Sequence, residues 1–297
     1  IDNGGKEHMS YQSMEEAKLR GEKENIPFWK AIQLEDAQER DVKIEDSWEQ
    51  MKYMWQSMLD ALDAYEPDKV SRSGLVGTEG GLMDSYRENE EPLCGDFVSK
   101  VMSNALKMGC NNACMKRIVA APTAGACGVL PAVLVTYYKE YNVPEEKMIE
   151  AMYVAAGLGQ IIANRAYLAG ASGGCQAEIG SGSGMAAGAI CYIKGGDTDQ
   201  IGHACAMALK NLMGLVCDPV GGLVEVPCVK RNVGGAVNAL AAADMALAGI
   251  TSKVPVDQVI DAMKEVGDKM DVSLRETGVG GVAGTPAAQE VVEKLGM

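Results

Sequence analysis

"SGSGMAAGAICY", residues 181–192, and "GGAVNALAAADMALAG", residues 234–249, consist mainly of glycine, alanine and serine. Alanine has the highest helix propensity of all residues, so the alanine runs favour helices in both stretches. Small side chains allow helix backbones to approach closely, because the side chains at the contact set the distance between the two axes. The two stretches therefore predict closely packed helices whose ends come together around a shared point.

The sequence on both sides of these stretches also favours helices. "VPEEKMIEAM" (143–152) and "SKVPVDQVIDAMKEV" (252–266) each place a proline at the start of an expected helix and acidic residues in its first turn. Only "LVEVP" (223–227) resembles a strand. We therefore expect a mainly α protein, a helical domain with glycine-rich loops that converge on one site. Its helices are predicted near residues 95–109, 126–141, 145–168, 183–194, 199–214, 233–248 and 255–270.

The N-terminal quarter of the chain has a different character. Residues 10–66 are polar and helix-forming, and residues 47–65 place apolar side chains three and four positions apart, as in an amphipathic helix. Glycines in "SRSGLVGTEGG" (71–81) then interrupt regular structure. We predict an N-terminal helical segment over residues 1–66 and a main domain over 67–297. The sequence begins at Ile1 rather than at a methionine, so we expect residues 1–8 to be a non-native leader before Met9.

Composition excludes several classes of protein. The chain has 297 residues, 47% of them hydrophobic and 23% charged, which suits a sizeable core. A net charge of −14 argues against a nucleic-acid partner, and no phosphate-binding glycine motif occurs. Residues 118–138 are uncharged, but Pro122 and Pro131 favour a buried helix over a membrane span. Nine cysteines without a signal peptide predict a soluble protein of the reducing cytoplasm, with no membrane partner.

Three cysteines lie on turns bounded by glycine or proline. Cys175 is in "AGASGGCQAEIGSGSG" (169–184), and Cys217 and Cys228 delimit the loop in "GLVCDPVGGLVEVPC" (214–228). Three thiolates on such turns suit an iron–sulfur cluster with one iron open to a ligand. Zinc with three thiolates and a water is a competing interpretation, and buried thiols without a metal are another. The spacing of the cysteines does not decide between them.

The other six cysteines have simpler interpretations. Cys94, Cys127, Cys191 and Cys205 lie among apolar or small residues, where a free cysteine acts as a small core hydrophobe. Cys110 and Cys114 form a CxxxC without the CxxC that a cluster motif requires, so we assign them no redox role.

Five motifs, in order along the chain, resemble the α subunit of bacterial iron–sulfur L-serine dehydratases, over about residues 65–290. They are "SRSGLVG" (71–77), "PTAGACGVLPAV" (122–133), "SGGCQAEIGSGSGMAAGA" (172–189), "GLVCDPVGGLVEVPC" with the following "VKRN" (214–232), and "LRETGVGGVAGTP" (274–286). The resemblance implies a helical α domain and a [4Fe–4S] cluster held by Cys175, Cys217 and Cys228. It further implies a lyase that converts L-serine to pyruvate and ammonia, works with a β subunit and forms oligomers.

Residues for the chemistry follow from their positions in these motifs. Glu178 and Asp218 adjoin two of the three cysteines and are candidates for the general base. A base on the β subunit is the alternative. His203 lies on an expected helix and is interpreted as a packing or surface histidine, while His8 falls in the expected leader.

Substrate binding is assigned to residues that can hold a carboxylate. Arg72 can form a bidentate pair with it, and the neighbouring hydroxyls can donate hydrogen bonds. The predicted substrate-binding residues are Ser71, Arg72, Ser73 and Thr123. Two other functions stay open: a desulfidase-type enzyme that eliminates sulfide from L-cysteine, and a non-catalytic α-like subunit with structural cysteines.

Overall fold

The computed structural model describes residues 10–297, and these residues form helices and connecting loops without a strand. The mainly α prediction is confirmed. The α-helices are α1 (Met14–Glu24), α2 (Phe28–Glu39), α3 (Ile44–Asp63), α4 (Glu79–Asn89), α5 (Gly95–Ala113), α6 (Val129–Tyr141), α7 (Glu145–Arg165), α8 (Gly170–Gly173), α9 (Ser181–Ile193), α10 (Thr198–Asn211), α11 (Cys228–Leu247), α12 (Val256–Lys269) and α13 (Pro286–Leu295). Short helical turns are η1 (Gln176–Gly180, a π-helix), η2 (Val220–Gly222), η3 (Val272–Leu274) and η4 (Gly281–Gly284).

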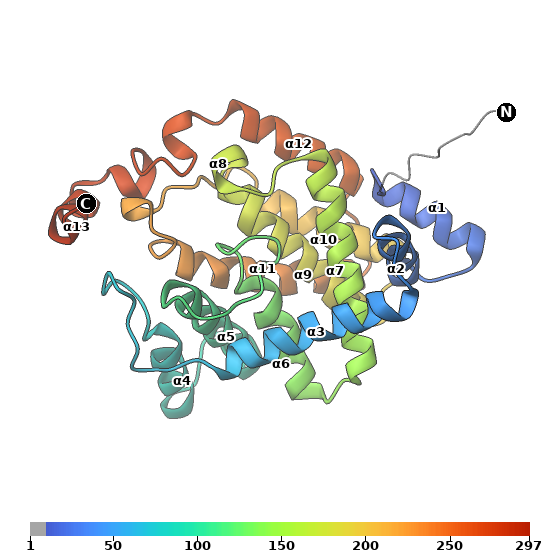
Figure 1. Ribbon diagram of the computed structural model, residues 1–297, viewed down its shortest axis with the longest axis horizontal. Coiled ribbons are helices and arrows are strands. Elements are labelled where there is room, and N and C mark those ends of the chain that lie inside the picture. Colours follow the sequence, from blue (N-terminus) through green and yellow to red (C-terminus); the bar gives the residue numbers. More distant parts are fainter. Residues whose placement is uncertain (1–9) are drawn as a thin grey trace.

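Helix α9 is the centre of the molecule, with α6, α7, α10 and α11 packed around it (Figure 1). Its residues from Ser181 to Cys191 are all buried. A Cβ atom added at Gly188 would lie 2.2 Å from Leu158 Cδ1 of α7, and one at Gly184 would lie 3.0 Å from Cys205 Sγ of α10. The small residues of α9 thus bring its neighbours close, as the sequence predicted.

The N-terminal helices pack onto this bundle. Helix α2 lies on α7, and α3 crosses α5, α6 and α7 (Figure 1). Trp55 and Met58 of α3 are fully buried, and they belong to the same hydrophobic core as the residues of α9. The described part of the N-terminal segment therefore shares one core with the rest of the chain, and the predicted division at residues 66 and 67 stays a prediction. The expected leader and His8 lie outside the described residues.

Three details differ from the sequence predictions. Helix α4 was not predicted, and its first residues, Glu79 to Gly81, belong to the stretch that we expected to interrupt regular structure. The "LVEVP" segment forms a turn rather than a strand. Cys94 is exposed, so it is not a core residue, whereas Cys127, Cys191 and Cys205 are buried as predicted.

The uncharged stretch at residues 118–138 forms a loop followed by α6. Helix α6 begins at Val129 and is buried through Thr136. In the described chain, no helix has both the length and the apolar character needed to cross a membrane.

Candidate active site

The three cysteines of interest lie at or close to the ends of the central helices. Cys175 comes directly before the π-helix η1, which continues into α9. Cys217 follows α10, and Cys228 is the first residue of α11. Their exposed fractions are 3%, 3% and 8%. Cys175 and Cys228 are thus buried at boundaries between a loop and a helix, and Cys217 is buried in the loop after α10. Single π-helical turns such as η1 are frequent at functional sites.

The backbone of Cys217 is fixed by a segment far along the chain. Its N–H donates to Leu274 O (2.8 Å), and its carbonyl accepts from Glu276 N (2.7 Å). Residue 276 has a φ of 63°, in the left-handed region that a non-glycine residue seldom adopts. Strained backbone of this kind is concentrated at functional sites. The "LRETGVGGVAGTP" motif therefore lies against the second cysteine.

Electrostatic coupling shows that the three thiols share one neighbourhood. Burial raises the pKa of Cys217, and negative charge on Cys175, Glu178, Glu276 and Cys228 raises it further. Burial, reinforced by charge on Cys175, raises the pKa of Cys228 to about 12. A buried thiolate next to other negative groups is unfavourable without a compensating positive charge. The site is therefore a set of protonated thiols unless a cation neutralises them.

Cys175 has a positively charged neighbour. Burial raises its pKa to about 11, and the guanidinium of Arg231 acts in the opposite direction. Among residues 10–297, no group of three or more His, Cys, Asp or Glu side chains is arranged to hold one metal ion.

Glu178 lies on the π-helix η1, and its carboxyl group is close to the thiol of Cys217. Its Oε1 accepts a hydrogen bond from Thr123 Oγ1 (2.8 Å), and its Oε2 is 3.9 Å from Cys217 Sγ. Burial raises the pKa of the Glu178 carboxyl. A Cβ atom at Gly170 would lie 2.6 Å from Cys217 Sγ and 2.8 Å from Glu178 Oε2, so only glycine leaves room there. The structure thus brings together two predicted catalytic or substrate residues, Glu178 and Thr123, at one of the three thiols.

Asp218, the other predicted base, has a different environment. It is buried, its Oδ1 is 2.7 Å from Arg231 Nη1, and its Oδ2 accepts a hydrogen bond from Val282 N (2.7 Å). Oδ2 therefore accepts a hydrogen bond, whereas Oδ1 is engaged by the ion pair with Arg231 without hydrogen-bond geometry. These contacts tie the cysteine loop to α11 and to η4, which is a structural role. A catalytic role for Asp218 stays a prediction without support from these contacts.

Arg231 was not singled out from the sequence. It lies one helical turn after Cys228, and its Nη1 also donates to Val216 O (2.8 Å). Its positive charge also acts on Cys175, where it lowers the pKa of the thiol. One side chain therefore connects the segments that carry all three cysteines. Its position in the "VKRN" motif, directly after the third cysteine, was the available signal.

Loss of this arginine is expected to destabilise the protein strongly. Arg231→Gln leaves Asp218 as a buried carboxylate without a partner charge, which should lower the free energy of unfolding by about 3–5 kcal/mol in urea denaturation. The matched control is Lys230→Gln at the adjacent position, whose ion pair with Glu79 (2.8 Å) involves a lysine that is 58% exposed. It should cost at most about 1 kcal/mol. Equal losses in the two variants would contradict the structural role of Arg231.

Ser71 and Ser73 point toward a buried carboxylate. Ser71 Oγ donates to Glu225 Oε2 (3.0 Å), Ser73 Oγ donates to the same oxygen, and the two hydroxyls are 2.9 Å apart. Glu225 lies between Cys217 and Cys228, and it was not identified from the sequence. The "SRSGLVG" turn is therefore fastened to the cysteine loop. Arg72 is exposed and lines a surface pocket of about 370 Å³ with Glu225.

Substrate binding by the four predicted residues stays a prediction. The serine hydroxyls are engaged with Glu225, whereas Arg72 is solvent-accessible. His203, which we had interpreted as a packing or surface histidine, is on α10 and lines a separate pocket. Glu276, a second carboxylate near Glu178 and Cys217, also escaped the sequence analysis.

Comparisons with known proteins give a consistent result. The sequence model of the family described as Serine dehydratase alpha chain matches residues 16–283. The probable L-serine dehydratase alpha chain of Bacillus subtilis (strain 168) is 46% identical over 251 residues, 84% of this chain and 84% of that protein. The L-serine dehydratase alpha chain of Peptoniphilus asaccharolyticus is 41% identical over 250 residues, 82% of this chain and 85% of that protein.

Longer relatives match as well. The L-serine dehydratase of Streptomyces coelicolor is 42% identical over 182 residues, which are 60% of this chain and 40% of that protein. The relatives are named dehydratases, which are lyases, and the site of this chain holds buried thiols beside a carboxylate. The chain is therefore a helical enzyme of the lyase class. The chain belongs to the serine dehydratase alpha chain family. The resemblance that the motifs carried is confirmed.

Proposed function

We propose that this chain, together with a β subunit, dehydrates L-serine to pyruvate and ammonia at a [4Fe–4S] cluster bound by Cys175, Cys217 and Cys228. The observation that carries the proposal is the grouping of three buried thiols with Glu178 in a chain of this family. The relatives named above are called L-serine dehydratases, which supports serine as the substrate.

The donor set suits a cluster better than one ion. Each cysteine ligand of a cluster binds a different iron, so its thiolates are spread around the cluster rather than around one point. The described residues do not converge in the way that a single ion requires, which gives no support to the zinc interpretation. The raised thiol pKa values mean that cluster binding must displace protons, with the positive charge of the irons stabilising the thiolates.

Serine dehydration removes the α-proton and expels the β-hydroxyl, a poor leaving group. The bound cluster supplies a Lewis-acidic iron for that hydroxyl. In this proposal Glu178 accepts the α-proton, and the hydrogen bond from Thr123 orients its carboxyl. Burial strengthens Glu178 as a base, because it raises the pKa of the carboxyl. The aminoacrylate that leaves the site tautomerises and hydrolyses to pyruvate and ammonia in water.

A β subunit completes the proposed enzyme. The relatives of similar length are named alpha chains, whereas this chain matches 40% of the longer Streptomyces coelicolor protein, which is named L-serine dehydratase. A partner over the cysteine site would exclude water and supply further substrate contacts. A cytoplasmic, oligomeric assembly remains our expectation for the complete enzyme.

The test is anaerobic purification of the chain alone and together with its β subunit, followed by iron, sulfide and pyruvate assays. We expect equal amounts of iron and sulfide in both preparations, and fast pyruvate formation from L-serine only with the partner. The β subunit should raise kcat more than it lowers KM. An iron-free preparation with full activity would refute the cluster, and a loaded, complete assembly inactive on L-serine would refute the reaction. Faster turnover of L-cysteine would instead favour a desulfidase.

A further inference from the structure

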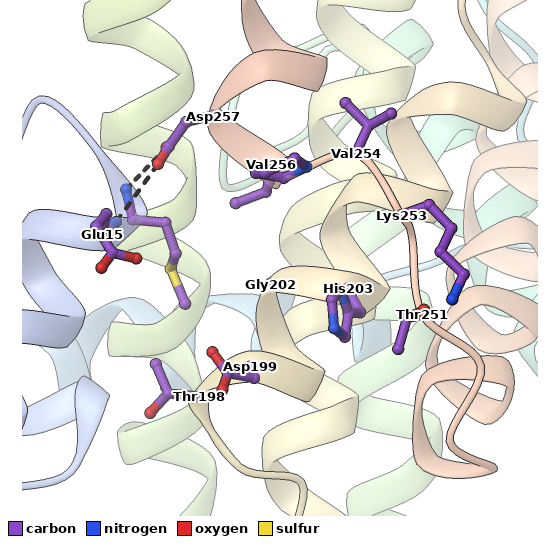
Figure 2. Close-up of a pocket in the computed structure, with 12 residues that line it drawn as sticks. Glu15, Thr198, Asp199, Gly202, His203, Thr251, Lys253, Val254, Val256 and Asp257 are labelled. Atoms are coloured by element: carbon purple, nitrogen blue, oxygen red, sulfur yellow. Dashed lines mark hydrogen bonds between the residues drawn. The ribbon is translucent and has the colours of Figure 1, made fainter.

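A second pocket lies apart from the cysteine site. It has a volume of about 420 Å³ and sits where α1 meets the N-terminal ends of α10 and α12 (Figure 2). None of its lining residues belongs to the site around the cysteines. The size falls in the range of cavities that hold small ligands. The pocket therefore needs an interpretation of its own.

One end of the pocket carries donors and a positive charge. Figure 2 shows His203, Thr251 and Lys253 together on this side. Nδ1 of His203 accepts a hydrogen bond from Ser252 N (3.4 Å), so in the neutral ring Nε2 carries the proton and acts as a donor. Lys253 is exposed and forms no ion pair or hydrogen bond within the described chain. An ammonium, an imidazole N–H and a hydroxyl are suited to a carboxylate.

The backbone at Lys253 supports a functional interpretation of this end. Its φ is 64°, in the left-handed region that is costly for a side chain with a Cβ atom. Residues in such conformations are concentrated at ligand-binding and active sites. The loop thus holds an unpaired lysine at the pocket edge in a strained conformation.

The opposite end is acidic. Glu15, an exposed carboxylate, lines it on the far side of the pocket from Lys253 (Figure 2). Asp199 lies one turn before His203 on α10, between the two ends, and pairs with Lys18 at 2.5 Å, so Glu15 gives this end its negative charge. Asp257 also lines the pocket, but its oxygens accept from the backbone N–H groups of residues 14 and 15. This end therefore favours a cation.

The floor between the two ends is open and apolar. A Cβ atom on Gly202 would meet nothing closer than 3.8 Å, where it would touch Val256 and Met14. A free α-amino acid carries both charges on one carbon and would reach only one end. A ligand whose ammonium and carboxylate are separated by a short chain would reach both.

We propose that this pocket binds a small zwitterion with separated charges, of the class of a dipeptide or an ω-amino acid. The carboxylate lies at Lys253, His203 and Thr251, and the ammonium lies at Glu15. The inference does not depend on the proposed serine chemistry, because the pocket and the cysteine site share no residue.

The histidine content of the chain provides a direct probe. The sequence contains two histidines, His8 and His203, so the imidazole signals of the labelled full-length chain can be assigned with a His203→Gln variant. Glycylglycine, L-serine and pyruvate are titrated separately. We expect glycylglycine to shift the His203 signals saturably and to bind tightest of the three. Lys253→Gln should weaken its binding by about tenfold or more, a loss of about 1.4 kcal/mol.

Two controls separate this site from the rest of the molecule. Lys23→Gln, which removes an exposed lysine of α1 outside the pocket, should leave glycylglycine binding unchanged. Cys217→Ser should also leave it unchanged, so failure of the serine dehydratase proposal would not affect the result. Absence of a saturable His203 shift with glycylglycine would overturn the proposal. Equal or tighter binding of pyruvate or L-serine would overturn it too, because the acidic end would then contribute nothing.

Discussion

A Cys217→Ser variant is expected to lose bound iron and to retain no serine turnover above background. Serine offers a neutral hydroxyl where the proposed cluster needs a thiolate, and iron–sulfur clusters are held by cysteine thiolates. Cys175→Ser and Cys228→Ser should behave in the same way, because charge on either thiol raises the pKa of Cys217 and the three thiols therefore lie near one another. The measurements are iron content, absorbance of the anaerobically purified protein and pyruvate formation. All three should change together.

Cys94→Ser and Cys114→Ser are the matched controls for this loss. Cys94 is exposed and Cys114 is half-buried, and neither is coupled to the three proposed ligands. Both variants should keep full iron content and activity. If Cys175→Ser, Cys217→Ser and Cys228→Ser all retained their iron, the assignment of these residues as ligands would be wrong.

Glu178→Gln is expected to lower kcat by roughly 10²–10⁴-fold while iron content stays unchanged, the range typical for loss of a general base. The amide keeps the size of the side chain and can still accept the hydrogen bond from Thr123, so folding and the neighbouring thiols should be preserved. Thr123→Val should have a smaller effect, because it removes only the group that orients the carboxyl. The measurement is steady-state pyruvate formation with iron content determined in parallel.

Glu276→Gln serves as the comparison for Glu178→Gln. Glu276 is the second carboxylate near Cys217, but it is exposed. Its variant should keep most of its activity if Glu178 is the base. A large loss in Glu276→Gln with normal activity in Glu178→Gln would move the base to the 274–286 motif. Normal activity in both variants would place the base on the β subunit.

The helices around α9 could be predicted because their small residues and proline starts are local signals. Helix α4 could not be, since Gly80 and Gly81 read as loop residues in the sequence. In the structure they are packing positions: a Cβ atom at Gly80 would lie 2.4 Å from Lys107 Cγ, and one at Gly81 would lie 2.8 Å from Pro67 Cβ. From the sequence alone, a glycine that ends a helix cannot be distinguished from a glycine inside a helix that allows another segment to pack closely against it.

The candidate site shows the same limit. The three cysteines could be identified from their turns and from the family motifs. Arg231, Glu225 and Glu276 could be identified only from their contacts in the folded structure. Glu225 is separated by 154 positions from Ser71, the residue that donates to it. Local patterns carry no information on such pairs, because the contact depends on how distant segments are brought together.

The pairing of Cys217 with residues 274 and 276 means that the backbone of the middle cysteine depends on a segment more than fifty residues further along the chain. A nascent chain that has already released all three cysteines from the ribosome still lacks the segment that fixes the middle one. Until residue 276 emerges, the backbone of Cys217 is unpaired and its thiol is open to metal donors and to oxidants. A chain cut off before residue 274 is therefore expected to leave the backbone of Cys217 unpaired and its thiol more exposed than in the folded protein.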